Sequence, residues 1–306
     1  MTDTTITLDG GRTASAAPAA RPQRRRFRFG AWMGLLPFLG FLFLFLLLPT
    51  YGVVTKAFSN ESGGFTTSAI SDVISNERKA FYGSMKVSFV TALLGVVLGT
   101  MLAYAAATAT RPKWLRSLVS AFSGVAANMG GVVLAFLFIT LLGRQGLGTK
   151  LVREGLGYDL YGTSWFDISS FWGWVTVYMY FQIPLMVLVT LPAIDGLKPA
   201  WREASSNLGG TTWTYWRRVG LPVLAPSMLG GFLLLFANAF SAYATVYALN
   251  TQANLMPVKI SAGLRNDVGG RSPAPYALAT CMIVVIAVAM GGYLLLRKRA
   301  ERWRAT

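Results

Sequence analysis

The chain has 306 residues, of which 54% are hydrophobic and only 13% are charged, and its formal net charge is +16. Together with a mean hydropathy of +0.49, this composition excludes an ordinary soluble domain and indicates an integral membrane protein. There is no histidine and one cysteine, Cys281, which excludes Ser/His or Cys/His catalysis, histidine-ligated metals and an intramolecular disulfide. We predict no cofactor, no metal site and no enzymatic activity.

Six apolar stretches follow a basic tail over residues 1–30, which we predict to be disordered and cytoplasmic. Each stretch has the roughly 20 apolar residues that a helix needs to span a bilayer, and irregular backbone cannot face lipid. We therefore predict an all-α integral membrane domain of six transmembrane helices over residues 31–296, followed by a basic cytoplasmic tail at 297–306. The predicted spans are 31–54, 84–107, 117–142, 171–193, 223–249 and 274–296.

Basic residues are distributed unevenly between the two sides that six spans define. The side with both tails, the turn near Arg111 and the loop at 195–222 carries 18 of the 28 basic and 5 of the 12 acidic residues, which leaves 10 and 7 on the other side. Because cytoplasmic loops carry the Lys/Arg excess, we predict that both termini and this loop are cytoplasmic. Orientation and contact with lipid headgroups then explain the basic charge, and no nucleic acid is expected as a partner.

The loop at 195–222 has the composition of two short helices joined by glycine. Pro199 suits the first turn of a helix, where its missing N–H costs nothing, and Gly209–Gly210 ends that helix. A following threonine caps a second helix at 213–218. Pro222 is expected to end it, because the residue before a proline avoids the α region. The small residues at the tip allow another protein to approach the backbone.

The residues of this loop resemble the "EAA" loop of permease subunits of ATP-binding-cassette (ABC) importers, whose pattern is E-A-A-x3-G-x9-I-x-L-P. Ser205 stands where the family has its second alanine, and Val219 stands where it has isoleucine. The matching residues are Glu203, Ala204, Ser205, Gly209, Leu221 and Pro222. The resemblance implies the six-helix type I importer permease (MetI-like) fold, and it implies that these residues form the coupling helices that dock on an ATPase subunit.

The chain lacks a phosphate-binding loop of its own. The nearest pattern, at 143–150, has Thr-Lys where such a loop has Lys followed by Ser or Thr, and it follows an apolar span instead of a strand. The predicted spans hold no Asp or Glu, and their one charge, Lys86, lies at a span end, which disfavours a proton-driven carrier. Energy is therefore expected to come from a partner or from a gradient, and the family resemblance implies a partner ATPase. An ion-gradient-driven transporter and a scaffold without transport activity stay open as alternatives.

Polar side chains inside the spans have two explanations: hydrogen bonds between helices, or the lining of a translocation path. In the resembled family the third and fifth of these spans help to line the path, so polar positions in and near them are the first candidates. The candidates are Asn128, Gln182, Asn238, Ser241 and Tyr243. A path without fixed charge selects poorly, which agrees with the family's use of an external binding protein for selection.

The resemblance also implies partners, location and cargo. It implies a bacterial inner-membrane permease that works with two ATPase subunits, a second permease, expected to be a different chain, and an extracytoplasmic solute-binding protein. The segments 182–186 and 191–197 look most like permeases of the spermidine/putrescine subgroup, so a polyamine is the expected cargo. Relatives of that subgroup also carry ferric iron, thiamine and phosphonates, which are the alternatives.

Overall fold

The computed structural model describes residues 29–60, 64–109, 114–162, 166–267 and 272–305. These ranges contain helices and turns, with one isolated bridge between Ser59 and Phe65 and no strand. In chain order the elements, with η marking a π-helical segment, are α1 (Phe29–Leu42), η1 (Phe43–Leu47), α2 (Leu48–Ala57), α3 (Ser68–Asn76), α4 (Arg78–Thr108), α5 (Trp114–Ala126), α6 (Gly131–Leu142), α7 (Leu147–Leu156), α8 (Phe171–Asp195), α9 (Pro199–Asn207), α10 (Thr212–Tyr215), η2 (Trp216–Gly220), α11 (Leu221–Ser241), α12 (Ala244–Leu249), α13 (Met256–Asn266) and α14 (Ala274–Ala305).

The chain divides into two compact units, residues 1–49 and 50–306. The described part of the first unit consists of α1, η1 and the start of α2, an apolar helical run with Pro37 inside α1. The second unit holds the remaining helices. The predicted tail at 1–30 lies almost entirely outside the described residues.

Within the described ranges, six helical segments are long and apolar enough to cross a membrane, which confirms the all-α, six-helix prediction. The segments are Leu35–Ala57, Arg78–Thr108, Gly131–Leu156, Phe171–Asp195, Thr212–Ser241 and Ala274–Leu296. The fourth and sixth agree closely with the ranges expected from the sequence. The third and fifth differ, because both are interrupted.

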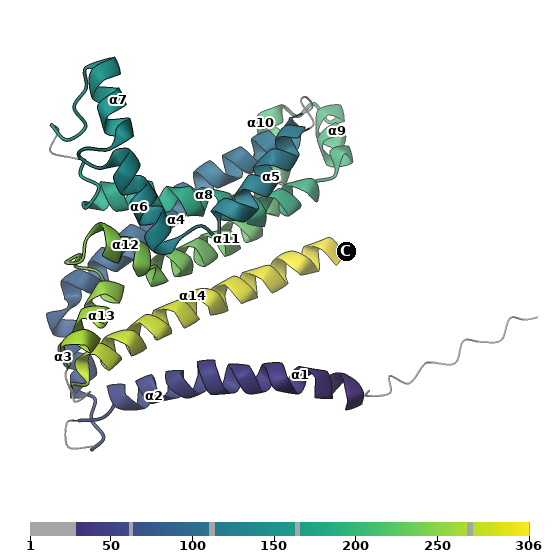
Figure 1. Cartoon of the computed structure of the whole chain (residues 1–306). Helices are drawn as coiled ribbons and strands as arrows, with labels where there is room; N and C mark the ends of the chain where they lie inside the picture. The colour runs from purple at the N-terminus through teal and green to yellow at the C-terminus, as the bar shows by residue number, and fades with distance from the viewer. Residues whose placement is uncertain (1–28, 61–63, 110–113, 163–165, 268–271, 306) are drawn as a thin grey trace, which may run out of the picture. The chain divides into compact units, whose positions relative to one another are not determined.

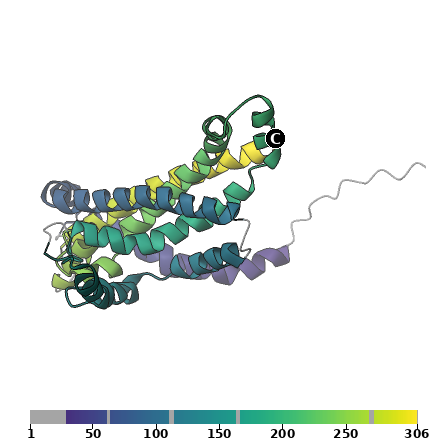
Figure 2. The same ribbon diagram turned by 90° about the horizontal axis from the view of Figure 1, so that it is seen from above.

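The second unit is organised around α4, α8 and α11, and α14 packs against α11 (Figures 1 and 2). The close approach of α4 to α8 and α11 depends on Gly95 and Gly99, which are one helical turn apart. A Cβ added at Gly95 would lie 2.7 Å from Leu235 Cδ2, and one at Gly99 would lie 2.5 Å from Met186 Cβ. Small residues of this kind let membrane helices approach closely without a hydrophobic driving force.

The third predicted span is not one helix. α5 ends at Ala126, and α6 begins at Gly131, whose φ of +77° lies in the left-handed region. With 13 and 12 residues, neither helix can cross a bilayer alone. Thr245 Oγ1 accepts the N–H of Gly131 (2.9 Å) and donates to its carbonyl (3.2 Å). The break in the third span is therefore held against α12.

The fifth predicted span, 223–249, is broken as well. α11 ends at Ser241, and the helix resumes as α12 only at Ala244. Between them Ala242 is extended (φ −70°, ψ 99°), and its carbonyl accepts a hydrogen bond from Tyr178 OH at 3.0 Å. Non-helical backbone within a membrane domain requires such a partner. The prediction was wrong here because the apolar run continues through the break.

The short helices of the second unit gather at its two opposite ends (Figure 1). α9 and α10 lie where α8 finishes and α11 starts, whereas α3, α12 and α13 lie toward the other end. At that other end the buried Ser84 Oγ accepts the N–H of Met256 at 2.8 Å, which joins α13 to α4.

Candidate coupling elbow and translocation path

Residues 195–222, which we call the coupling elbow, contain α9, and Pro199 occupies the first turn of this helix as predicted. The helix ends in a Schellman motif: Gly209 N–H donates to the Ser206 carbonyl and Gly210 N–H donates to the Ser205 carbonyl, both at 2.9 Å. Gly209 has φ +74°, a conformation that glycine adopts without steric cost. The predicted glycine stop is confirmed.

The second half of the elbow differs from the prediction. Thr211 caps α10, as its Oγ1 accepts the N–H of Thr214 at 3.3 Å. Pro222 does not end this helix, because α10 passes through the π-helical turn η2 directly into α11. The wider turn accommodates a proline that has no N–H to donate. Leu221 and Pro222 are exposed in the first turn of α11.

The outer face of the elbow exposes apolar side chains beside a groove. Leu208 is 88% exposed and Trp213 is 70% exposed. The groove, of about 420 Å³, is lined in part by the predicted Ala204 and Ser205. Glu203 is exposed, and within the described ranges no cation forms an ion pair with it. Exposed apolar patches of this kind mark contact sites with another protein or with the membrane.

The base of the elbow is fixed to the spans. Trp216 packs edge-on against Tyr104 of α4, with ring centroids 5.0 Å apart. Gly220 makes room for this ring, since a Cβ there would lie 2.6 Å from Trp216. Arg116 of α5 forms an ion pair with Asp195 at the end of α8. The base of the elbow is therefore in contact with both α4 and α5.

Among the predicted path residues, Gln182 lies in the packing between helices. Its side chain is fully buried, and Nε2 donates to the Leu235 carbonyl (3.1 Å) and to Thr91 Oγ1 (3.4 Å). These bonds join α8 to α11 and α4, which is the helix-to-helix explanation considered for all of these residues. Gln182 Oε1 has no partner among the described residues.

The other four candidates lie at the two breaks. Asn128 is exposed between α5 and α6, where its Nδ2 donates to the Gly124 carbonyl at 2.9 Å. Asn238 and Ser241 are exposed near the end of α11, and Ser241 Oγ donates to the Asn238 carbonyl at 3.1 Å. Tyr243 is half-buried just before α12. Because α6 and α12 are bonded to each other, the two breaks are neighbours.

Two residues of α13, Ser261 and Arg265, join this group and were not predicted. Ser261 Oγ lies 2.8 Å from Tyr243 OH, and Arg265 NH1 donates to Tyr247 OH at 2.6 Å. With Ser241 they line a pocket of about 440 Å³, which we call the α13 pocket. The i, i+4 spacing of the two tyrosines and of the two α13 residues was visible in the sequence, but without the break nothing indicated that the pairs meet.

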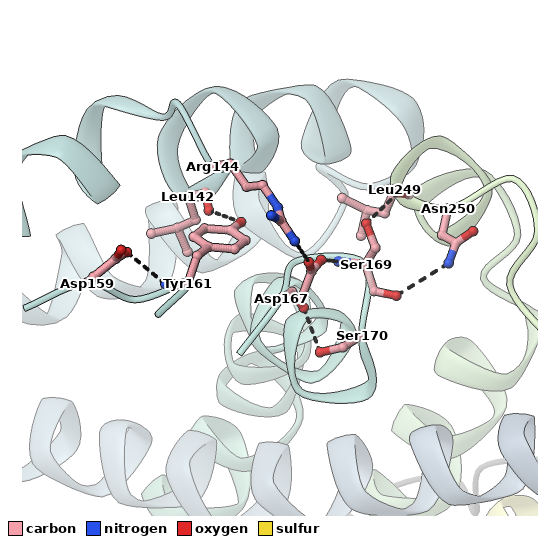
Figure 3. A network of polar contacts seen from close by, with 9 residues as sticks. All are labelled: Leu142, Arg144, Asp159, Tyr161, Asp167, Ser169, Ser170, Leu249 and Asn250. Carbon is pink, nitrogen blue, oxygen red and sulfur yellow. Dashed lines mark hydrogen bonds and ion pairs between the residues drawn. The ribbon is translucent and has the colours of Figure 1, made fainter. Parts of the chain in front are cut away.

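At the end opposite the elbow, a polar network joins three segments that are far apart in the sequence (Figure 3). Arg144, after α6, forms an ion pair with Asp167 at 3.1 Å. Ser169 Oγ donates to the Leu249 carbonyl (3.2 Å), and Asn250 Nδ2 donates to the Ser169 carbonyl (3.4 Å). The network therefore fixes the segment that leads into α8 against the C-terminal end of α12.

Two carboxylates at this end are held in the ionised form. The backbone N–H of Ser169, followed by Arg144, holds the pKa of Asp167 below its ordinary value. The side chain of Arg153 lowers the pKa of Asp159, with which it pairs at 3.1 Å. In the described part of the chain, no three His, Cys, Asp or Glu side chains converge as a metal site would require.

Comparison with known sequences shows what these features resemble. The profile of the family described as "Binding-protein-dependent transport system inner membrane component" matches residues 95–302. The molybdenum transport system permease protein ModB of Escherichia coli K12 is 23% identical over 236 residues, 74% of this chain and 97% of ModB. The sulfate permease CysT of Salmonella typhimurium LT2 is 25% identical over 227 residues, 72% of this chain and 76% of CysT. The spermidine/putrescine permease PotC of Haemophilus influenzae is 25% identical over 131 residues, which are 42% of this chain and 50% of PotC.

Two solved structures share the fold. A chain of a bacterial ABC transporter that imports the acidic polysaccharide alginate matches with a TM-score of 0.65 and 16% identity, over 89% of this chain and 95% of that chain. A second structure is of the alginate transporter in complex with an alginate pentasaccharide-bound periplasmic protein. It matches with a TM-score of 0.64 and 18% identity, over 90% of this chain and 95% of that chain. These matches confirm the predicted importer-permease fold.

Proposed function

The chain belongs to the family of inner membrane components of binding-protein-dependent transport systems, and from that premise we propose that the coupling elbow is the docking site of an ATPase subunit. The chain is a multi-pass permease subunit of an ABC importer in the inner membrane; it is not an enzyme, since ATP hydrolysis belongs to separate subunits. The residues that we assign to coupling are Glu203, Ala204, Ser205, Gly209, Leu221 and Pro222.

One observation carries this proposal: an exposed apolar tip stands on a base that is anchored in the membrane domain. Leu208 and Trp213 give the tip large side chains that an interface core favours. Trp216 connects the same segment to α4. A partner that grips the tip can therefore move the spans, which a loosely attached loop would not allow.

We further propose that the elbow and both termini face the cytoplasm. The Lys/Arg excess on that side supports this orientation. Residues 1–30 and 297–306 are then cytoplasmic tails that flank the membrane domain at 31–296. The polar network of Arg144, Asp167, Ser169 and Asn250, at the end opposite the elbow, then faces the outside, where a solute-binding protein delivers its cargo. The second permease of the pair is proposed to be a different chain.

The proposed mechanism is alternating access. ATP binding closes a pair of ATPase subunits, and each elbow follows the subunit on which it is docked. Because η2 is continuous with α11, that movement reaches the break where Asn238, Ser241 and Tyr243 lie. We propose that these residues and Asn128 line the path. Gln182 is assigned to the packing that keeps α4, α8 and α11 together during the movement.

Cysteine replacements test docking and orientation in one experiment. In a chain that carries Cys281→Ser, Leu208→Cys places a thiol on the elbow tip, and Tyr158→Cys places a matched exposed thiol just after α7, outside the candidate spans. We expect a membrane-impermeant maleimide to label the first only in inside-out vesicles and the second only in right-side-out vesicles. Bound ATPase should protect the first alone. Labelling of Leu208→Cys from outside, or no protection by the ATPase, would refute the assignment.

For the cargo, the first candidate that we propose is a polyamine, because segments 182–186 and 191–197 resemble polyamine permeases and because PotC is among the relatives. An oxyanion is the second candidate, since the ModB and CysT matches cover a larger share of the chain and Arg265 lies beside the proposed path. Uptake of labelled spermidine, challenged with excess sulfate or molybdate, distinguishes the two. Spermidine uptake that these anions do not reduce would favour the polyamine.

A further inference from the structure

The α13 pocket contains two groups, Ser261 and Arg265, that the proposed mechanism does not use, beside the proposed path residues Ser241 and Tyr243. It lies between the end of α11, α13 and α14 and is lined on α14 by the apolar side chains of Met282, Ile283 and Ile286. Its polar lining includes Arg265, Ser261, Tyr243 and Ser241. A concave site with mostly apolar walls and a few convergent polar groups is the usual form of a ligand site.

Two pairs of side chains meet at this pocket and hold the arginine in place. Tyr243 and Tyr247 are one turn apart and stack with ring centroids 5.1 Å apart. Ser261 and Arg265 are one turn apart on α13 and face them. The guanidinium carbon of Arg265 lies 4.7 Å from the centre of the Tyr247 ring, and NH1 bonds the hydroxyl of the same residue. The cation is thereby preorganised on an aromatic surface.

The arginine and its neighbours keep donors to spare. A guanidinium has five N–H groups, and Tyr247 takes one of them. Across the described ranges no carboxylate lies within ion-pair distance of Arg265. Tyr243 and Ser261 need one O–H between them for their mutual bond, so the other hydroxyl can donate elsewhere.

We propose that the α13 pocket binds an anionic, oxygen-bearing group, with Arg265 as a two-pronged donor and the Tyr243–Ser261 pair as a third. The inference rests on the proposed permease function and adds a site beside its path. An oxyanion of this chemistry has two sources: a transported solute that pauses beside the path, or the phosphate of a membrane lipid. Arg265 would repel a polyamine from this pocket, so a transported oxyanion bound here would favour the second cargo candidate.

Arg265 also lies in the last turn of α13, where any cation stabilises the helix. That role alone would be filled by lysine as well. Two parallel N–H bonds to one anion require the planar guanidinium and are lost with lysine. Arg265→Lys therefore separates an anion site from a helix-end charge.

The test uses the complete transporter, purified with its ATPase and partner permease in nanodiscs. Labelled sulfate and molybdate are the solute probes in phosphatidylcholine discs, and bound phosphatidylglycerol, counted by native mass spectrometry, is the lipid probe in mixed discs. We expect an anion to bind the wild type and Arg265→Gln to weaken its binding about tenfold or more. Arg265→Lys should also bind more weakly than the wild type. The matched control Arg153→Gln, which removes a cation of α7, should bind normally.

Each outcome is decisive. Arg265-dependent binding of sulfate or molybdate identifies a solute site, and Arg265-dependent retention of phosphatidylglycerol identifies a lipid site. If neither depends on Arg265, or if Arg265→Lys binds as the wild type does, the site is overturned. ATP-driven uptake by the wild type is measured separately: its failure would count against the permease function, whereas unchanged anion binding in a working Arg265→Gln transporter would count against the pocket alone.

Discussion

Replacing Gly209 by Asp and by Asn asks whether another protein covers the elbow tip. Gly209 has φ +74°, and apart from Gly209 and its two chain neighbours no atom lies within 4 Å of the place that a Cβ would take. Asp and Asn tolerate this left-handed conformation better than other L residues do, and the two side chains have the same shape. Both variants should fold with similar stability, within about 1–2 kcal/mol of the wild type.

The two variants differ once a partner surface excludes water from the tip. An amide that loses its hydrogen bonds costs about 1–3 kcal/mol, whereas an unpaired buried carboxylate costs several kcal/mol. A difference of about 2–3 kcal/mol corresponds to about 30- to 150-fold in the affinity for the ATPase. Gly209→Asp should therefore abolish transport while the protein stays folded in the membrane.

Three measurements complete this test: the melting temperature of the purified permease, the affinity for the ATPase, and uptake by reconstituted vesicles. We expect equal melting temperatures, with affinity and uptake much lower for Gly209→Asp than for Gly209→Asn. Equal affinities for the two variants would refute the reasoning. So would a melting temperature that falls for Asp alone, because the loss of transport would then come from folding.

Three other outcomes follow from the packing and charges. Gly99→Ala should destabilise the fold by about 1–3 kcal/mol, because the new methyl group overpacks α4 against α8; Gly124→Ala, with no atom within 4 Å, should not, and equal melting temperatures would count against close packing. Trp216→Ala should preserve ATP hydrolysis but lower uptake per ATP, since the contact with Tyr104 is lost; an unchanged ratio would contradict this. Because the fold lowers the pKa of Asp167, its stabilising contribution should be complete above the ordinary aspartate pKa of about 3.9 and should decline as pH falls below it; acid melting curves should show this decline, and Asp167→Asn should lack it.

The elbow could be predicted in detail because the rules that shape it are local. Pro199 begins a helix and Gly209 ends it whatever surrounds them, and each acts within one turn. The error came at Pro222, which was expected to end the helix by a local rule that takes no account of packing between helices. Trp216 packs on Tyr104 of α4, and the chain widens into a π turn instead of ending the helix.

The site near the fifth-span break could be predicted only in part. Ser241 and Tyr243 were recognisable as polar residues within an apolar run. The break itself depends on Tyr178, which lies 64 positions before Ala242 and supplies the hydrogen bond for its carbonyl. No sequence pattern indicates that partner. Without the break, Arg265 belonged to an ordinary loop and Gln182 could not be assigned to packing rather than to the path.

The irregular segments at the two ends of α11 explain how one helix can serve both sites. α11 has 21 residues, so it spans roughly 32 Å at 1.5 Å per residue. At one end the π turn joins the elbow to α11 without a gap in the helix, and at the other end the extended Ala242 separates α11 from α12. In the mechanism that we propose, a displacement of the elbow is delivered to Asn238 and Ser241, while α12 stays bonded to α6 through Thr245. Movement between these two groups changes the polar surroundings of the break, which is where a path that opens and closes must change.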